Sequence, residues 1–282
     1  MVARVMAEDV FWGETKLKKI IDRQTIALQE ERNAERAGKA RSLYASDYGQ
    51  CMKKSFFSFF PEKYVVAPFD ARVLRIFHNG DAVHERLVRY LKREKGLGFL
   101  DEVPVPQDEL GVHGRCDGVC LVDGRATVVE FKSINRDAVQ EAKEEHVGQV
   151  SWYMAMWRKL RGELRGDFGF GVDDELCEDD VVGVESASGR FFNELEDVEK
   201  LLLLSRGEIV GEIIMESKST NEVFAFPVDW DADRVRKVRL WFEQLEWHVR
   251  NESVPKVQYM RERFPCSWKG GKCPYFKECW KE

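Results

Sequence analysis

The chain has 282 residues, of which 44% are hydrophobic and 12% aromatic, so it can bury the core of one large domain or two small ones. Its formal net charge of -6 argues against a protein that coats nucleic acid through global charge, although a local basic groove is compatible with it. Because no apolar run approaches the length of a membrane span or of a signal-peptide core, we expect a cytoplasmic protein with no membrane partner.

Two helices are expected in the first hundred residues. Residues 14–38 place apolar side chains among many charges, which predicts a surface helix that is basic at its start. Residues 69–95 repeat apolar residues at helical spacing from Val83 to Leu91, and this predicts a second helix. His84 shares this apolar stripe, where a histidine is more often a core residue than a ligand.

The pattern changes to that of strands between residues 111 and 134. This segment, GVHGRCDGVCLVDGRATVVEFKSI, is rich in valine and is interrupted by Asp123-Gly124, a strong signal for a two-residue hairpin turn. With that turn, Val122 faces Arg125. The sequence therefore predicts two antiparallel strands joined by a tight turn.

Counting outward from this turn places Asp117 across from Glu130. Strand alternation puts Lys132 on the face of Glu130 and Phe131 on the opposite, apolar face. Directly opposed carboxylates destabilise a sheet unless something offsets their charge, and a divalent cation would do so. Carboxylates that hold Mg²⁺ or Mn²⁺, with a lysine beside them, suit the hydrolysis of phosphodiesters by metal-activated water.

A bare Glu-x-Lys tripeptide is common and is usually a solvated strand face. The chain contains a second copy, Glu216-Ser217-Lys218, on another predicted strand. No aspartate is paired across a tight turn with Glu216, so we interpret that copy as a polar strand edge. The paired Asp117 favours the first copy as the candidate site.

Two further helices, two further strands and one insertion are expected. They are a helix over 136–160, a loop-rich insertion over 162–208, two strands within 211–228 and a helix over 231–248. We therefore predict an α/β fold with a mixed twisted sheet flanked by helices and a metal-clamped C-terminal segment. The predicted organisation is an N-terminal helical segment (1–45), a nuclease-type core with the hairpin (46–161), the insertion (162–208) and a strand, helix and cysteine segment (209–282).

At the hairpin, GRCDGV followed by VVEFKS, the chain resembles the PD-(D/E)xK nuclease superfamily, in particular the RecB-like exonucleases that include the CRISPR-associated iron-sulfur exonucleases and the AddB nuclease domain. GDAVHERL matches the histidine motif of that family at His84, and QVSWY matches its Q-x-x-x-Y motif at Gln149 and Tyr153. The resemblance implies a restriction-endonuclease-like fold. It also implies that His84, Asp117 and Glu130 bind the metal, and that Gln149 and Tyr153 support the site or contact DNA.

Cys51 lies far upstream of Cys266, Cys273 and Cys279, and this layout is similar to that of the iron-sulfur members of the family. The resemblance implies a four-iron four-sulfur cluster held by these four thiolates. Structural Zn²⁺ is the alternative, although the gaps of six and five residues are wider than those of usual zinc knuckles. The gap after Cys266 also departs from the two residues that are frequent in the family.

The other cysteines are not expected to bind a metal. Cys116 and Cys120 are assigned to the hairpin face opposite Asp117, as small buried thiols. Cys177 lies in the insertion and has no assigned role.

The resemblance implies a metal-dependent DNA exonuclease that prefers single-stranded DNA. No helix-turn-helix or zinc-finger reader of duplex DNA is identified, and basic residues and aromatics could hold a single strand. These are Lys53, Lys54, Arg234, Arg236, Lys237 and Arg239, with Trp152, Tyr153 and Trp268. One alternative is a catalytically weak DNA-binding or assembly subunit that works with recombination, replication or CRISPR-adaptation proteins. Another is an iron-sulfur or zinc protein unrelated to nucleic acid.

Overall fold

The computed structural model describes residues 15–36, 41–165, 192–259, 261, 265–268 and 271–280. The chain divides into two compact units, Met1–Lys39 with Pro68–Asn79, and Ala40–Ala67 with Gly80–Glu282. No helix among the described residues is long and apolar enough to cross a membrane.

The smaller unit contains helix α1 (Lys16–Arg36) and the first part of helix α3 (Ala71–Arg93). Both helices confirm the sequence-based prediction. Within this unit, the carboxylate of Asp22 accepts hydrogen bonds from Lys18 at 2.8 Å and from Arg75 at 2.5 Å.

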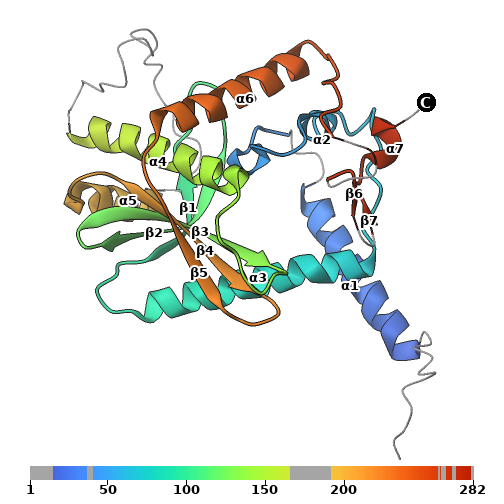
Figure 1. Ribbon diagram of the computed structural model, residues 1–282, viewed down its shortest axis with the longest axis horizontal. Coiled ribbons are helices and arrows are strands. Elements are labelled where there is room, and N and C mark those ends of the chain that lie inside the picture. The colour runs from blue at the N-terminus through green and yellow to red at the C-terminus, as the bar shows by residue number, and fades with distance from the viewer. Residues whose placement is uncertain are drawn as a thin grey trace, which may run out of the picture. The chain divides into compact units, whose positions relative to one another are not determined.

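A five-stranded mixed sheet forms the centre of the larger unit (Figure 1). Its strands, in spatial as well as chain order, are β1 (Leu100–Val105), β2 (Gly114–Val122), β3 (Arg125–Ile134), β4 (Val210–Ser217) and β5 (Val223–Val228). Neighbouring strands are antiparallel except β3 and β4, which are parallel. Parallel strands need a crossover, and helices α4 (Glu144–Arg165) and α5 (Phe192–Leu204) lie between β3 and β4 in the sequence.

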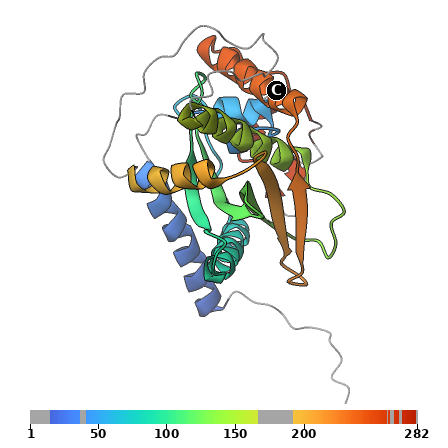
Figure 2. The same cartoon turned by 90° about the vertical axis from the view of Figure 1, so that its left-hand side faces the viewer.

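Helices cover both faces of this sheet (Figures 1 and 2). On one face, α4, α5 and helix α6 (Ala232–Arg250) contribute to the main hydrophobic core, which includes Trp157, Leu202 and Phe242. On the other face, the part of α3 after Gly80 packs Val83 and Leu87 against a smaller cluster from β2 and β3. The predicted α/β architecture, a mixed sheet flanked by helices, is thus present.

The remaining described elements are short. They are the 3-10 turn η1 (Ala45–Asp47), helix α2 (Met52–Phe57), the two-residue strands β6 (Ser267–Trp268) and β7 (Gly271–Lys272), and helix α7 (Phe276–Cys279). Strands β6 and β7 pair with each other in a sheet of their own.

The predicted hairpin is confirmed in turn and register. Val122 pairs with Arg125, and both turn residues have positive φ angles, 51° at Asp123 and 76° at Gly124. This is the backbone that an Asp-Gly turn favours, and it matches the right-handed twist of the two strands.

The helices beside the parallel pair differ from the prediction. Helix α4 begins at Glu144 rather than near residue 136, and Asp137 instead accepts a hydrogen bond from Ser219 Oγ at 2.6 Å, a contact that the local sequence does not encode. Helix α5 occupies part of the segment expected to be loop-rich, because its Val198, Leu201 and Leu202 bury against the main core.

The interpretation of Glu216 as a polar strand edge is wrong. Strand β4 lies inside the sheet between β3 and β5, and the side chain of Glu216 is buried and forms an ion pair with Arg86 of α3. A partner on a distant helix makes this polar residue compatible with an interior strand.

Candidate active site

Asp117 occupies an irregular position in the sheet. Strand β1 pairs with β2 on either side of it, as Asp101 with Gly118 and Val103 with Cys116, but not at Asp117 itself. The β2–β3 pairing likewise ends at Gly118. Glu102, the β1 residue at the interruption, has a positive φ of 53°, a strained backbone that is frequent at functional sites.

The same irregularity separates two cysteines that were expected on one face. Cys116 packs in the main core beneath α4, whereas Cys120 packs in the smaller cluster beneath α3. The prediction that both lie opposite Asp117 is therefore wrong, because side chains alternate regularly only along an uninterrupted strand.

The interruption brings three possible metal ligands together. His84 Nε2 lies 3.5 Å from Glu102 Oε1 and 3.8 Å from Asp117 Oδ1. One ligand atom from each of the three residues falls within 4.8 Å of the others. They come from α3, β1 and β2, so the cluster is built from three elements of the larger unit.

Glu130 and Lys132 lie beside this cluster on β3. Lys132 Nζ donates to Glu130 Oε1 at 2.5 Å, and only 3% of Glu130 is exposed. The second oxygen, Glu130 Oε2, and the His84 Nε2 atom are buried without a hydrogen-bond partner among the described residues. Buried polar atoms are normally paired, so both atoms fit a ligand at this site.

Burial dominates the electrostatics of these groups. It raises the pKa of Asp117 to about 6, with Lys132 and the Phe131 N–H opposing and Glu102 adding to the rise. It raises the pKa of Glu130 to about 7, where Lys132 opposes and Asp117 adds. Burial alone would lower the pKa of Lys132, but Glu130 and Asp117 outweigh it and the pKa is raised. The lysine is therefore charged and held among carboxylates.

Gln149 and Tyr153 support strand β2 from α4. Gln149 Nε2 donates to the Tyr153 hydroxyl at 2.8 Å, and this hydroxyl donates to the Arg115 carbonyl at 3.2 Å. The Tyr153 ring passes under Gly114, where a Cβ would stand 2.6 Å from a ring carbon. Because Tyr153 is 2% exposed, its contacts are with the strand that carries Asp117.

Two of the aromatics proposed to stack bases are in the core. Trp152 and Tyr153 are both 2% exposed, so they cannot present a ring face to a nucleic acid. The side chain of Trp268 lies outside the described residues, and so does Cys177.

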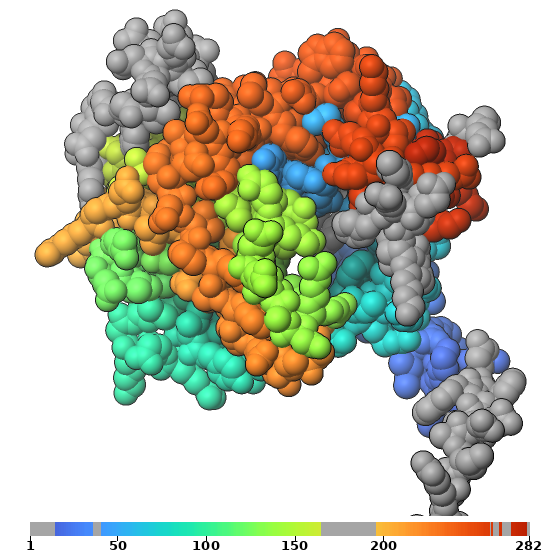
Figure 3. All heavy atoms as spheres, in the orientation of Figure 1, coloured from blue at the N-terminus to red at the C-terminus, as the bar shows by residue number. Residues whose placement is uncertain are grey.

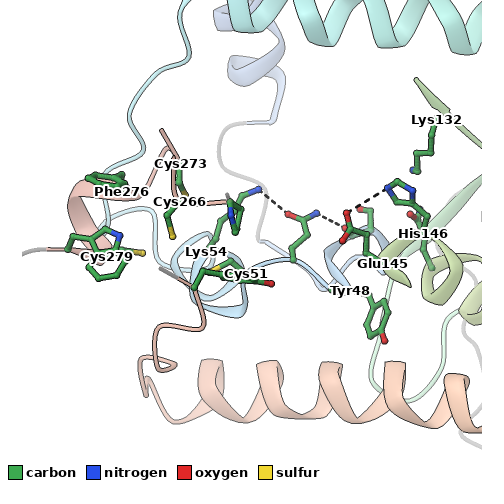
Figure 4. A pocket seen from close by; sticks show the side chains of 17 residues that line it. Tyr48, Cys51, Lys54, Lys132, Glu145, His146, Cys266, Cys273, Phe276 and Cys279 are labelled. Carbon is green, nitrogen blue, oxygen red and sulfur yellow. Dashed lines mark hydrogen bonds and ion pairs between the residues drawn. The ribbon is translucent and has the colours of Figure 1, made fainter. Parts of the chain in front are cut away.

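A cavity of about 510 Å³ extends from Lys132 to the four cysteines of the predicted cluster. Figure 4 shows Lys132 and His146 at one end and Cys266, Cys273 and Cys279 at the other, with Cys51 between them. In the space-filling view of Figure 3, the segment around residue 50 (blue) lies beside the C-terminal residues (red).

The cysteine end joins two segments that are far apart in the sequence. Cys51 precedes α2, while Cys273 donates its backbone N–H to the Cys266 carbonyl at 2.9 Å and Cys279 ends α7. Burial raises the pKa of Cys279 to about 12, and the neighbouring Cys51, Cys273 and Cys266 contribute to the rise. The four thiols are thus close enough to influence one another.

Sequence reasoning missed two residues of the site, Glu102 and His146. The local sequence around Glu102 carries no signal, because its role depends on β1 pairing with β2. His146 precedes Gln149 by one helical turn, and this spacing was a usable signal. Its pKa is lowered to about 3 by burial and by Lys132 and Lys143, so this cavity-lining imidazole is neutral.

No protein-family model and no curated protein matches the chain. Among solved structures, SSO0001 is similar over 88% of this chain and 91% of its own, with 11% identity and a TM-score of 0.48. The alkaline exonuclease LHK-Exo from Laribacter hongkongensis is similar over 79% of this chain and 93% of its own, with 11% identity and a TM-score of 0.37. Its complex with dAMP gives 12% identity over the same shares and the same TM-score.

Proposed function

We propose that this chain is a divalent-metal-dependent DNA exonuclease that prefers single-stranded DNA. The observation that supports this most directly is the convergence of His84, Glu102 and Asp117 within 4.8 Å, beside the buried Glu130–Lys132 pair. A cation surrounded by carboxylates, with a lysine aimed at the same place, is suited to phosphodiester hydrolysis.

The donor set fits Mg²⁺ or Mn²⁺. Carboxylate oxygens suit both ions, and the imidazole of His84 is better suited to the softer Mn²⁺. His84 Nε2 and Glu130 Oε2 have no hydrogen-bond partner in the described part of the chain, and both could contact a metal ion or its bound water. We assign His84, Glu102 and Asp117 as ligands and Glu130 as a fourth, at the buried side of the site.

When bound, the metal polarises the phosphoryl group and lowers the pKa of water at the site. Water adds to phosphorus, the bond from phosphorus to the leaving oxygen breaks, and the proton of the water ends on that oxygen. Lys132, held at 2.5 Å by Glu130, supplies positive charge where negative charge develops. Gln149 and Tyr153 keep strand β2, and therefore Asp117, in place.

The preference for a single strand and the requirement for a strand end both come from the resemblance to RecB-like exonucleases.

The test compares linear and circular single-stranded DNA of one sequence, with Mn²⁺ present and with EDTA. We expect metal-dependent loss of the linear strand only. Equal degradation of both forms would reject the requirement for an end, and cutting only at fixed duplex sites would reject the substrate class. Absence of cleavage under every condition would favour the DNA-binding subunit.

We further propose that Cys51, Cys266, Cys273 and Cys279 hold a four-iron four-sulfur cluster, with Zn²⁺ as the alternative. Four thiols from two distant segments line one cavity, and thiolates are the ligands that both groups use. The bound group would tie the C-terminal segment to the residues that precede α2, which is a structural role.

A further inference from the structure

We propose that Arg115 binds a phosphate oxygen of the DNA strand next to the metal-binding residues. The inference rests on the proposed nuclease function, because it places the substrate at the same site. Arg115 would be the second positively charged side chain of the site besides Lys132, on the side formed by β1 and β2.

Glu102 connects the guanidinium to the metal-binding residues. Its Oε1 lies 3.5 Å from His84 Nε2, and its Oε2 lies 3.9 Å from Arg115 Nε. One carboxylate thus faces a metal ligand with one oxygen and the guanidinium with the other. A phosphate bound at His84 and Asp117 would stand within reach of the Arg115 side chain.

The guanidinium is held in position but keeps donors available. Arg115 Nη1 donates to the Glu102 carbonyl at 2.8 Å, and this hydrogen bond fixes the direction of the side chain. Arginine has five N–H donors in a planar fork, and half of this side chain, 49%, is exposed. Such a fork matches the geometry of phosphate oxygens and loses little freedom when it binds them.

The backbone of Arg115 is fixed as well. Its carbonyl accepts the Tyr153 hydroxyl at 3.2 Å, and the residue pairs with Pro104 of β1. A rigid backbone and a restrained guanidinium make Arg115 a preorganised cation. A solvated arginine on a strand edge would have neither restraint.

The same contacts also fit a different role, in which Arg115 only offsets the charge of Glu102. The two roles predict different measurements. A phosphate-binding arginine contributes to DNA affinity and to its salt dependence, even without metal. An arginine that only offsets Glu102 changes the affinity for Mn²⁺ and leaves DNA binding alone.

The experiment measures the affinity of the metal-free protein for a fluorescent single-stranded oligonucleotide in EDTA at several salt concentrations, and separately measures Mn²⁺ binding. The variants are Arg115→Ala, Arg115→Lys and the matched control Arg125→Ala, an exposed arginine at the turn end of the same hairpin. Thermal melts verify that each variant is folded.

We expect Arg115→Ala to weaken oligonucleotide binding by about tenfold at low salt and to reduce the slope of log affinity against log salt by about 0.7, the loss of one phosphate contact. Arg115→Lys should keep the slope and recover part of the affinity, and Arg125→Ala should bind like the wild type. Unchanged DNA binding by Arg115→Ala, or a change in Mn²⁺ affinity alone, would overturn the proposal. If the wild type cleaves DNA and Arg115→Ala binds and cleaves DNA equally well, only this inference is rejected. If the wild type neither binds nor cleaves DNA, the proposed function is rejected too.

Discussion

The carboxylate of Asp117 accepts a hydrogen bond from the backbone N–H of Phe131, with 2.6 Å between Oδ2 and the nitrogen. The side chain thereby bridges β2 and β3 at the point where their pairing ends. Its other oxygen, Oδ1, lies 3.8 Å from His84 Nε2. The orientation of Asp117 is therefore set by the β3 backbone, before any metal binds.

Removing the charge of Asp117, Glu130 or Lys132 should abolish cleavage while the fold remains. We expect Asp117→Asn, Glu130→Ala and Lys132→Ala each to reduce the rate by on the order of 100-fold or more, because each removes a metal ligand or the charge aimed at the phosphate. The measurement is Mn²⁺-dependent loss of an end-labelled single strand.

Glu216→Gln is the control for these variants, because Glu216 belongs to the other Glu-x-Lys tripeptide. It should lower the melting temperature, since it breaks the ion pair with Arg86, but leave cleavage intact. Active Glu130 and Lys132 variants with an inactive Glu216 variant would place the active site at Glu216-Ser217-Lys218 instead.

Glu102→Gln should weaken Mn²⁺ binding. We expect an affinity about 10- to 100-fold lower, with cleavage restored at high Mn²⁺, because a ligand or its close partner is lost while the fold is kept. Titration calorimetry measures the affinity directly. Asp101→Asn is the matched control, because it removes the same charge from the neighbouring residue, whose carboxylate forms an ion pair with Lys92. An unchanged Mn²⁺ affinity in Glu102→Gln would remove Glu102 from the ligand set.

The metal-free protein should lose stability as the pH rises from about 4 to 7. The pKa of Asp117 is raised to about 6 and that of Glu130 to about 7, so in this range the folded state binds more protons than the unfolded state. Stability falls with pH wherever the folded state binds more protons. Melting curves in EDTA should therefore show a larger decrease between pH 5.5 and 7.5 for the wild type than for Asp117→Asn/Glu130→Gln.

Added Mn²⁺ should raise the melting temperature more at pH 7.5 than at pH 5.5, because the carboxylates must be deprotonated to bind it. If the melting temperature of the wild type and of Asp117→Asn/Glu130→Gln depends on pH in the same way, the two carboxylates are not the source of this pH dependence.

Tyr153→Phe should destabilise the protein by about 1–3 kcal/mol, because Gln149 Nε2 and the Arg115 carbonyl lose their buried partner. We also expect kcat to fall more than KM rises, since Tyr153 supports β2 and is buried away from the substrate. Urea denaturation and steady-state kinetics measure the two effects. Tyr90→Phe, at an exposed tyrosine of α3, is the control. A change in KM alone would indicate a direct DNA contact instead.

Anaerobically purified protein should be brown and contain about four irons per chain. Cys273→Ala and Cys279→Ala should lose metal and stability together, because metal binding and local folding are coupled. Cys120→Ala is the control, because this buried thiol packs beneath α3. The Cys120→Ala protein should keep the same iron content as the wild type. A colourless protein with one zinc per chain would replace the cluster by the alternative metal.

The local sequence was sufficient to predict the turn and the register of the hairpin. The turn at Asp123-Gly124 and the alternation of the strands correctly predicted that Val122 pairs with Arg125, because turn type and side-chain period are local properties of the chain. Helices α1 and α3 were predicted for the same reason, from their apolar spacing.

Non-local contacts explain where sequence reasoning failed. Helix α5 was not predicted, because its apolar side chains are explained only by the main core against which they pack. Glu216 resembled an exposed strand edge, since its partner Arg86 is 130 residues away. The sequence around Trp152 does not distinguish an aromatic that stacks on bases from one in the core, and in the fold Trp152 is buried.

The sequence by itself determined the Glu130–Lys132 strand face and the hairpin that brings Asp117 close to it, because both depend on residues within one turn of the chain. Only the tertiary structure decided that Glu102 and His84 complete the cluster and that Arg115 borders it. Those residues lie on three elements whose pairing and packing arise from burial of the two cores. Side chains brought together in this way carry no signal in the spacing of the sequence.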